Sequence, residues 1–419
     1  MKVTYIGHAC ILLESAGTRI LMDPWLTDPT YHGTWWHYPP LALGPRDLPK
    51  LDYLYISHEH MDHFDPPTLR QLDKDVHVII ANFKRKRFRD RIAALGFSRI
   101  TEVDFGRDFR CNGSGLTVRL IPPDRTWDDS AILVKDGSTT VLNVNDCHLD
   151  DATLGQLGRE HQIDLAFLTF TGASQYPGCF EFPLRSKLQR WRESKESHLE
   201  EFVSWARLLR TKRAVPAAGN FALLAPDQLF MNTPHYVSTP QEAIERLRVA
   251  APQIEGVQMN PGDVWTSDGS LTRLHPAPDW SRRLEQIEDL SRQHGAQIAE
   301  GFASEGEAPA DLYERFHAYF TALLQADPSI APRVNIVTWW VVDGAHGGDW
   351  VIDFTRERDW VYRGVPSCWN LRLKFPARLV YQGVSGDAIW DNLVLSFRLR
   401  LARNPDRYNK EFWTWLCKL

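Results

Sequence analysis

Three imidazoles and a carboxylate that could hold metal ions fall within the six-residue run His58-Glu59-His60-Met61-Asp62-His63. The run directly follows Leu51–Ile56, whose alternating apolar residues predict a buried strand. A regular helix cannot place positions 58, 60, 62 and 63 on one face, whereas a loop at a strand end can aim them in pairs. The spacing therefore predicts a two-metal site, with the first two histidines at one metal and Asp62 with His63 at the other.

The alternative interpretation is a histidine-rich surface turn without metal, but four ligand-type side chains at this spacing after a buried strand are rare. The run does not name the metal, because imidazole suits zinc, iron and copper while carboxylates favour harder ions. The chemistry it predicts is metal-assisted, either hydrolysis by a metal-activated water or oxygen chemistry at a redox metal.

The elements around this loop alternate between strand and helix. Met1–Asp23 has the pattern of two strands around a turn, Val76–Ile80 that of a buried strand, and Lys84–Leu95 that of a basic helix ending at Gly96. Thr139–Asp146 repeats the pattern of a strand that ends in a carboxylate. This alternation predicts an α/β fold built as a layered sandwich.

The composition limits the classes of function. With 419 residues and a net charge of −5, the chain has the make-up of a globular protein without a bias towards polyanions, so nucleic-acid binding is disfavoured. The N-terminus enters a strand without the apolar core of a signal peptide, and no run is long enough to span a membrane. Six scattered cysteines without Cys-x-x-Cys spacing suggest reduced thiols and a cytoplasmic location. The oligomeric state does not follow from the sequence.

The run His-x-His-x-Asp-His is also the signature of the metallo-β-lactamase fold, which this sequence resembles. The likeness begins at Tyr5–Leu13 and Arg19–Trp25, which are similar to the opening strands of the lactonase-type branch. Other segments resemble the non-Rieske part of the CMP-N-acetylneuraminate hydroxylases and their bacterial relatives, namely Gly33–Trp36, Asn143–Cys147, Ile389–Asp391 and Asn404–Tyr408. The resemblance implies an αββα sandwich.

The resemblance also implies a third ligand for the first metal, and here the sequence departs from the fold's hydrolases. They take a histidine in the loop after the strand that corresponds to Leu116–Asp124, and this chain has none between His77 and His148. The carboxylates offered are Asp124, Asp128 and Asp129, and matching from the next strand places the ligand nearest Asp124 or Arg125. We take Asp124 as the candidate, and a carboxylate here favours iron over zinc.

Two more ligands are implied for the second metal. Asp146 matches the family's bridging carboxylate, although an aspartate after a strand can also cap a turn. The last histidine of the family falls where this chain has Gly219-Asn220, and the nearest histidine is His235. His235 is therefore the candidate, with an ordinary surface histidine as the alternative. His148 and Asp150 lie close enough in sequence to Asp146 to support the ligands.

The loop Thr27–Pro49 is rich in Pro, Trp, Tyr and His and is too long for a simple connection. We interpret it as a lid on the substrate side, with Trp35, Trp36 and His37 as substrate-binding residues. Core packing is the alternative for the two tryptophans, and an exposed loop histidine is the alternative for His37.

Changes in pattern along the chain suggest three parts. Residues 1–265 would form the dimetal domain, residues 266–330 a helical linker around an acidic stretch, and residues 331–419 a small α+β domain. The last part alternates like antiparallel strands before a helical segment, and it is loosely similar to sterol-carrier domains.

The resemblance favours a non-haem di-iron oxygenase that uses two iron ions and dioxygen to hydroxylate a bulky carrier- or nucleotide-linked small molecule. The ligand set is also similar to that of di-iron β-hydroxylases of natural-product biosynthesis. Asp62 and Asp146 would be its catalytic carboxylates. The alternatives are a dizinc metallo-hydrolase of lactonase, esterase or phosphodiesterase type and a metal-free binding protein with a vestigial motif. Because the sequence has no Cys-x-His and Cys-x-x-His pair for a Rieske cluster, an oxygenase would need an electron-transfer partner.

Overall fold

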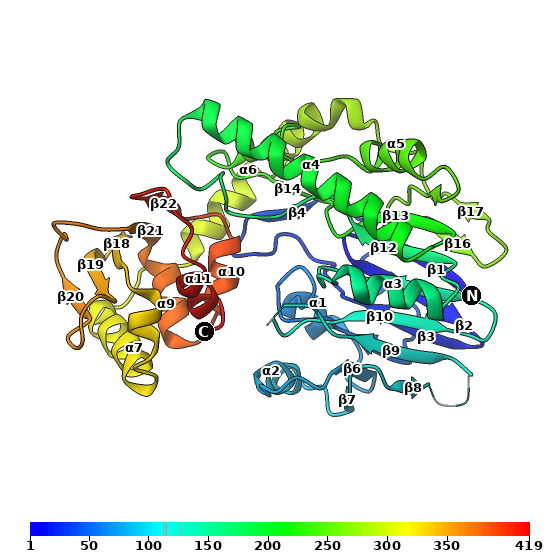
Figure 1. Ribbon diagram of the computed structural model, residues 1–419, viewed down its shortest axis with the longest axis horizontal. Coiled ribbons are helices and arrows are strands. Elements are labelled where there is room, and N and C mark those ends of the chain that lie inside the picture. The colour runs from blue at the N-terminus through cyan, green and yellow to red at the C-terminus, as the bar shows by residue number, and fades with distance from the viewer. Residues whose placement is uncertain (112, 114, 126) are drawn as a thin grey trace.

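Two β-sheets packed face to face form the larger part of the molecule, and helices cover their outer faces (Figure 1). The computed structural model describes residues 1–419 except 112, 114 and 126. Within these residues, the first sheet has eight strands in the order β17 (Leu271–Thr272), β16 (Val264–Thr266), β1 (Lys2–Gly7), β2 (Cys10–Ser15), β3 (Thr18–Met22), β5 (Tyr53–Tyr55), β6 (His77–Ala81) and β7 (Ile100–Val103). The strands β3, β5, β6 and β7 are parallel.

The second sheet has seven strands over the described residues. Their order is β15 (Glu255–Gly256), β13 (Arg213–Ala217), β12 (Leu165–Thr169), β11 (Thr140–Asn143), β10 (Ala131–Lys135), β9 (Thr117–Ile121) and β8 (Asp108–Arg110). The strands β11, β12, β13 and β15 are parallel, as expected where helices connect consecutive strands on one face. Strand β4 (Trp35–His37) pairs with β14 (Phe221–Leu223) in a separate ribbon at the edge of the sandwich.

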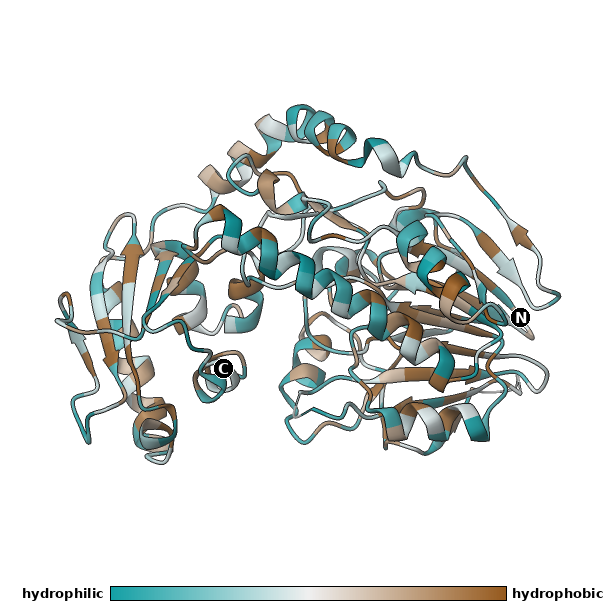
Figure 2. Cartoon of the chain, turned by 45° about the horizontal axis from the view of Figure 1, so that its top comes forward, coloured by the Kyte–Doolittle hydropathy of each residue, from teal (hydrophilic) through white to brown (hydrophobic). Residues whose placement is uncertain are grey.

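Helices close both outer faces of this sandwich. On the first sheet lie α1 (Pro66–Gln71) and α2 (Arg87–Ala94), and on the second lie α3 (Asp151–Glu160), α4 (Leu184–Leu208) and α5 (Pro240–Ala250). The strands between them are mainly hydrophobic, whereas α4 turns a hydrophilic face outwards (Figure 2). The predicted αββα sandwich of metallo-β-lactamase type is thus confirmed.

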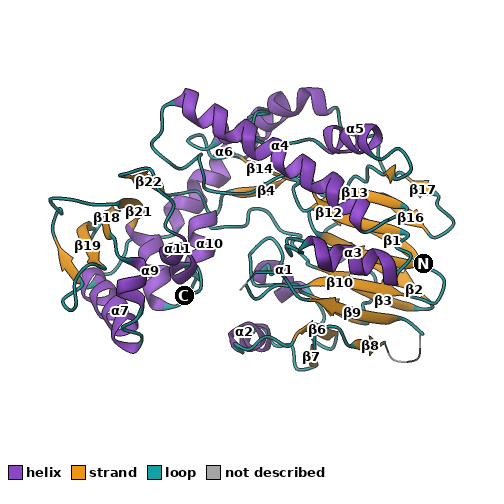
Figure 3. Ribbon diagram, in the orientation of Figure 1, coloured by secondary structure: helices purple, strands orange, loops and turns teal. Residues whose placement is uncertain are grey.

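A smaller α+β unit follows, at the far end of the molecule (Figure 3). Its sheet has the order β20 (Val361–Arg363), β19 (Gly348–Asp353), β18 (Val337–Asp343), β21 (Leu371–Pro376) and β22 (Arg400–Arg403). Its helices are α7 (Leu312–Ala326), α8 (Ile330–Val334), α9 (Ala377–Ser385), α10 (Trp390–Leu395) and α11 (Lys410–Leu416). We call residues 312–419 the C-terminal unit; its likeness to sterol-carrier domains stays a prediction.

Helix α6 (Arg283–Ser304) runs between the two units, and short 3-10 helices lie at Pro45–Asp47, Leu229–Asn232 and Trp280–Arg282. One hydrophobic cluster crosses from the sandwich into the C-terminal unit, because Trp25, Tyr31 and Trp35 pack in the same core as Trp340 and Trp390. The two units therefore share a buried hydrophobic interface and are not joined by a linker alone. No helix in the described part of the chain is long and apolar enough to cross a membrane.

Candidate metal centre

The candidate site lies where the carboxyl ends of parallel strands from both sheets meet. Strand β3 ends at Met22, and the backbone N–H of Asp23 donates to the carbonyl of Tyr55 at the end of β5 (2.9 Å). The carboxylate of Asp23 then accepts from the backbone N–H of Ser57 at 2.7 Å, which holds the start of the histidine loop. From the second sheet, β11 delivers Asp146 to the same place. Carboxyl ends of parallel strands are the usual position for ligand sites in α/β sheets.

Four strands reach this site through backbone conformations that non-glycine residues seldom adopt. His8 after β1, Asp23 after β3, Asn145 after β11 and Ala218 after β13 have φ angles of 52°, 44°, 54° and 54°. Left-handed conformations of this kind cost free energy and persist where the surrounding structure enforces them, commonly at functional sites. The four left-handed residues lie together at one edge of the sandwich, which indicates a functional site there.

Five side chains offer metal-ligand atoms at this edge. In one group, the donor atoms of His8, Asp62 and His63 lie within 4.8 Å of one another, and in a second group so do those of His58, His63 and Asp146. The two groups share His63, so they form one continuous cluster. Mixed imidazole and carboxylate donors suit zinc, iron or manganese.

His63, which belongs to both groups, has the features expected of a metal ligand. His63 Nε2 is buried and has no hydrogen-bond partner, although Asp62 Oδ2 and Asp146 Oδ2 lie 3.6 and 3.5 Å away. Two ligands each about 2.1 Å from a tetrahedral metal lie about 3.4 Å apart, so this spacing fits donors around a common cation. The residues therefore fit the metal that the motif implies.

The Nδ1 atoms of His58 and His63 contact hydroxyl and carboxylate oxygens of neighbouring residues. His58 Nδ1 lies 2.9 Å from Ser57 Oγ and 3.3 Å from Asp129 Oδ1, and His63 Nδ1 lies 3.2 Å from Asp23 Oδ2. Contacts of this kind fix the tautomer and ring orientation of a metal-binding histidine and leave Nε2 for the metal.

The charges of the cluster are strongly coupled. Burial alone would lower the pKa of His63, but Asp62, Asp146 and Asp23 outweigh it and raise that pKa well above its ordinary value. Burial would raise the pKa of Asp62, but His63 and then His8 hold it well below its ordinary value. In the metal-free protein, protons on the histidines thus balance the buried carboxylates.

His60 takes part in this balance in a different way. Its side chain is 25% exposed and lines the cavity, and its Nε2 is 2.9 Å from Asp391 Oδ2 of α10. Desolvation would lower the pKa of His60, but the hydrogen bond and charge of Asp391 outweigh it and raise the pKa to about 9.

These protonation states predict that the protein releases protons when it binds a metal ion. Because His60 has a pKa raised to about 9, it carries a proton near neutral pH in the metal-free protein, and a metal-ligating imidazole must lose its extra proton. Adding Zn²⁺ to metal-free protein in weakly buffered solution should therefore release protons, measured by pH-stat titration. The His60→Ala variant should release fewer protons per metal bound, and metal binding without proton release would contradict the assignment.

Of the predicted metal ligands, the structure brings His58, Asp62, His63 and Asp146 into the two donor groups but not His60, Asp124 or His235. His60 lines the same cavity and contacts Asp391. Asp124 is exposed, and its Oδ1 lies 2.9 Å from His148 Nδ1, outside both donor groups. Asp129, two residues before β10, is the carboxylate of this loop that contacts His58. His235 contacts Arg192 of α4 at 3.4 Å and lines a separate surface groove, so the nearest histidine in sequence is not near in space.

The ligand that sequence reasoning missed is His8. Its Nε2 lies 2.9 Å from Asp62 Oδ2, its side chain is 2% exposed, and its Nδ1 is buried without a hydrogen-bond partner. It stands in the turn between β1 and β2, where a short Gly-His-Ala sequence interrupts two apolar strands. A histidine at a tight turn between buried strands was the available signal, although it does not by itself point to a metal.

The predicted substrate-binding residues lie in a strand and not in an open lid. Trp35, Trp36 and His37 form β4 and are all buried, and successive side chains alternate between its faces. Trp35 lines the cavity, whereas Trp36 faces away and its ring packs 4.5 Å from that of His294. His37 Nδ1 is bonded to Asp28 (2.7 Å) and its ring lies on Trp25. Trp36 and His37 thus serve packing and not the cavity.

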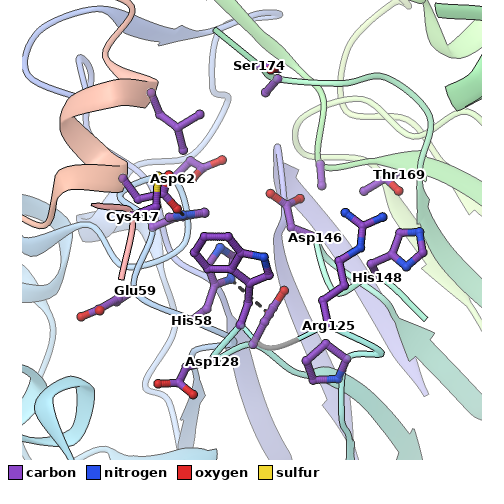
Figure 4. A pocket seen from close by; sticks show the side chains of 18 of the residues that line it. His58, Glu59, Asp62, Arg125, Asp128, Asp146, His148, Thr169, Ser174 and Cys417 are labelled. Carbon is purple, nitrogen blue, oxygen red and sulfur yellow. Dashed lines mark hydrogen bonds and ion pairs between the residues drawn. The ribbon is translucent and has the colours of Figure 1, made fainter. Parts of the chain in front are cut away.

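A cavity of about 660 Å³ opens above the cluster, between the sandwich and the C-terminal unit (Figure 4). Figure 4 shows Asp62 and Cys417 on one side of the pocket and Arg125 and His148 on the other, with His58 and Asp146 between them. Cys417 comes from the end of α11. The volume lies within the range of small-molecule sites, and walls from two units are a common setting for them.

Comparisons with known proteins agree with this description. The family described as the β-lactamase superfamily domain matches residues 2–159. The putative Rieske 2Fe–2S iron–sulfur protein of Mycolicibacterium smegmatis is 32% identical, over 99% of this chain and 84% of that protein. The cytidine monophosphate-N-acetylneuraminic acid hydroxylase of Danio rerio is 25% identical, over 99% of this chain and 71% of that protein.

Among solved structures, the diiron β-hydroxylase CmlA of Streptomyces venezuelae is 18% identical, with a TM-score of 0.44 over 65% of this chain and 54% of that chain. The alignment with the Mycobacterium tuberculosis proteins of the same Rieske description covers 58% of their length. Identity of 32% over nearly the whole chain is strong enough to assign the family. The chain belongs to the metallo-β-lactamase-fold family that includes the putative Rieske iron–sulfur protein of M. smegmatis.

Proposed function

We propose that this protein is a non-haem di-iron hydroxylase that acts on a bulky small molecule enclosed between its two units. The observation that carries the proposal is that the likeness to the hydroxylase of D. rerio extends over 99% of the chain. It therefore includes the C-terminal unit that roofs the metal centre, and not only the sandwich that hydrolases of many kinds share.

The geometry supports the proposal through a cavity that both units line. The cluster stands at the bottom of a cavity with apolar walls from Trp205, Ile389 and Leu395, the last two from the C-terminal unit. Walls from two units suit a bulky small-molecule substrate.

The donors present fit a pair of metal ions, and when bound, iron would supply the redox chemistry that dioxygen-dependent hydroxylation requires. The five residues of the two donor groups would hold them, namely His8, His58, Asp62, His63 and Asp146, and His60 of the same loop is proposed as a further ligand. Asp62 is 4% exposed and is held by His8 and Tyr31, so its task is to bind and orient. Asp146 is 37% exposed towards the cavity and can accept a hydrogen bond from a substrate group.

The electron donor is proposed to lie outside these 419 residues, because they contain no Cys-x-His and Cys-x-x-His pair. The related protein of M. smegmatis is described as a Rieske 2Fe–2S protein, which makes an iron–sulfur donor the natural class to test. A donor on a separate chain or segment would dock near the rim of the cavity.

The deciding experiment is metal analysis of protein expressed without added zinc, followed by oxygen uptake. We expect two iron ions per chain, visible absorption in the oxidised protein, and consumption of dioxygen after reduction with dithionite. The Asp62→Ala variant, treated identically, controls for iron bound elsewhere. A colourless protein with two zinc ions that hydrolyses a lactone or p-nitrophenyl ester would overturn the proposal in favour of a metallo-hydrolase.

A further inference from the structure

The C-terminal unit reaches the metal centre at Asp391, in the first turn of α10. The Oδ2 atom of Asp391 lies 2.9 Å from His60 Nε2, across 331 residues of sequence. The contact is sheltered, since the two side chains are only 25% and 16% exposed. The next residue, Asn392, donates from Nδ2 to the carbonyl of Glu59 at 3.4 Å, so α10 lies directly on the histidine loop.

The contact with Asp391 completes a pattern that the rest of the loop establishes. His58 and His63 each turn Nδ1 towards a carboxylate of the sandwich, Asp129 and Asp23, which leaves Nε2 for a metal. His60 lies beside the two donor groups and is a member of neither, and its Nε2 faces a carboxylate, so by this pattern Nδ1 is the nitrogen left for a metal. A carboxylate behind a ligating imidazole fixes its tautomer and direction and makes it a better donor.

We propose that Asp391 is a positioning residue of the metal centre, which accepts the Nε2–H of His60 and so presents Nδ1 to the metal. The consequence is that the first metal site is fully assembled only when the C-terminal unit is docked on the sandwich. This inference rests on the proposed metal site, but it holds equally for a hydroxylase and for a hydrolase.

The contact between Asp391 and His60 would also hold the C-terminal unit against the sandwich. The test must therefore separate the positioning of His60 from the docking of the two units. Asp391→Asn keeps the size of the side chain and removes its charge. The new amide can also donate a hydrogen bond to Nε2 of His60, which favours the tautomer with its proton on Nδ1 and so blocks that nitrogen for a metal. Asn392→Ala weakens the docking of α10 at the neighbouring residue without touching His60. Asp387→Asn makes the same chemical change at an exposed position whose carboxylate accepts from Ser385 Oγ (2.7 Å).

The experiment titrates Zn²⁺ and, separately, Co²⁺ into the metal-free full chain in competition with a chelator, and records the visible spectrum of bound Co²⁺. In Asp391→Asn we expect the Kd of one of the two metals to rise about 10- to 100-fold, with a changed Co²⁺ spectrum. The other metal should bind as in the unsubstituted protein. Asp387→Asn should match the unsubstituted protein in both readouts. Asn392→Ala should raise the Kd much less than Asp391→Asn and keep the Co²⁺ spectrum, because it leaves the contact between Asp391 and His60 in place.

Unchanged Kd values and spectra in Asp391→Asn would overturn the positioning role while leaving the metal centre intact. Equal losses in Asp391→Asn and Asn392→Ala would also overturn it, because docking alone would then explain the effect. If the unsubstituted protein binds no metal, the proposed function fails and this inference fails with it. If Asp391→Asn folds poorly, the test uses a double variant. Because Asp391 is proposed to act through His60, adding Asp391→Glu to His60→Ala should cause no further loss of bound metal beyond that of His60→Ala alone. A further loss would count against the proposal.

Discussion

Replacing Asp62 with alanine is expected to reduce the metal content from two ions to at most one per chain and to bring activity to background. The side chain contributes to the donor group with His8 and His63, and its two oxygens lie 2.9 Å from His8 Nε2 and 2.5 Å from the hydroxyl of Tyr31. Removing the carboxylate leaves those buried groups unpaired, which we expect to cost about 1–3 kcal/mol of stability. Elemental analysis beside a thermal melt measures both effects.

Asp65 provides a matched control three residues further along the same loop. It is buried like Asp62, but its Oδ2 caps α1 by accepting from the backbone N–H of Thr68 at 3.0 Å and also binds the hydroxyl of Thr27. Asp65→Ala should therefore cost about 0.5–2 kcal/mol of stability and keep both metals. Full metal content in Asp62→Ala, or equal metal loss in both variants, would show that the loop binds metal differently.

The parts of the site that could be predicted from the sequence are those set by local pattern. The strand Tyr53–Tyr55 and the loop that follows it are local, because alternation and ligand spacing are read within about a dozen residues. The sandwich was predicted for the same reason, since strand and helix periods alternate along the chain. Asp146 joined the site because it follows a strand of the second sheet, as Asp23 follows a strand of the first.

The remaining residues depend on which strand ends meet in space, which no local pattern reports. His8 belongs to a turn 50 residues before the motif, and Asp391 lies 331 residues after His60. Asp124 was chosen by counting along a loop, whereas the structure turns that loop so that Asp129 reaches the histidine. His235 is the histidine nearest in sequence to the end of a strand, but the structure does not place it at that edge of the sheet.

Replacing Trp35 with alanine should destabilise the protein by about 3–5 kcal/mol, which is the usual cost of truncating a buried tryptophan. The side chain is 1% exposed, its ring stacks on Phe221 with centroids 3.8 Å apart, and its Nε1 donates to the carbonyl of Leu395 in α10 at 2.9 Å. Trp35 therefore joins the sandwich to the C-terminal unit, besides lining the cavity. Chemical unfolding followed by far-ultraviolet circular dichroism measures the loss.

Two further substitutions separate packing from docking at this position. Trp35→Phe keeps an aromatic ring on Phe221 but removes the hydrogen bond to Leu395, so it should cost much less than Trp35→Ala. Trp36→Ala removes a tryptophan of similar burial from the opposite face of β4, where the ring contacts His294 and not the C-terminal unit. It should lower stability yet leave metal affinity unchanged, whereas Trp35→Ala should lower both because α10 would no longer be held over His60. A Trp35→Ala protein that unfolds at the same denaturant concentration as the unsubstituted chain would instead favour the interpretation of Trp35 as a substrate-binding residue of a lid.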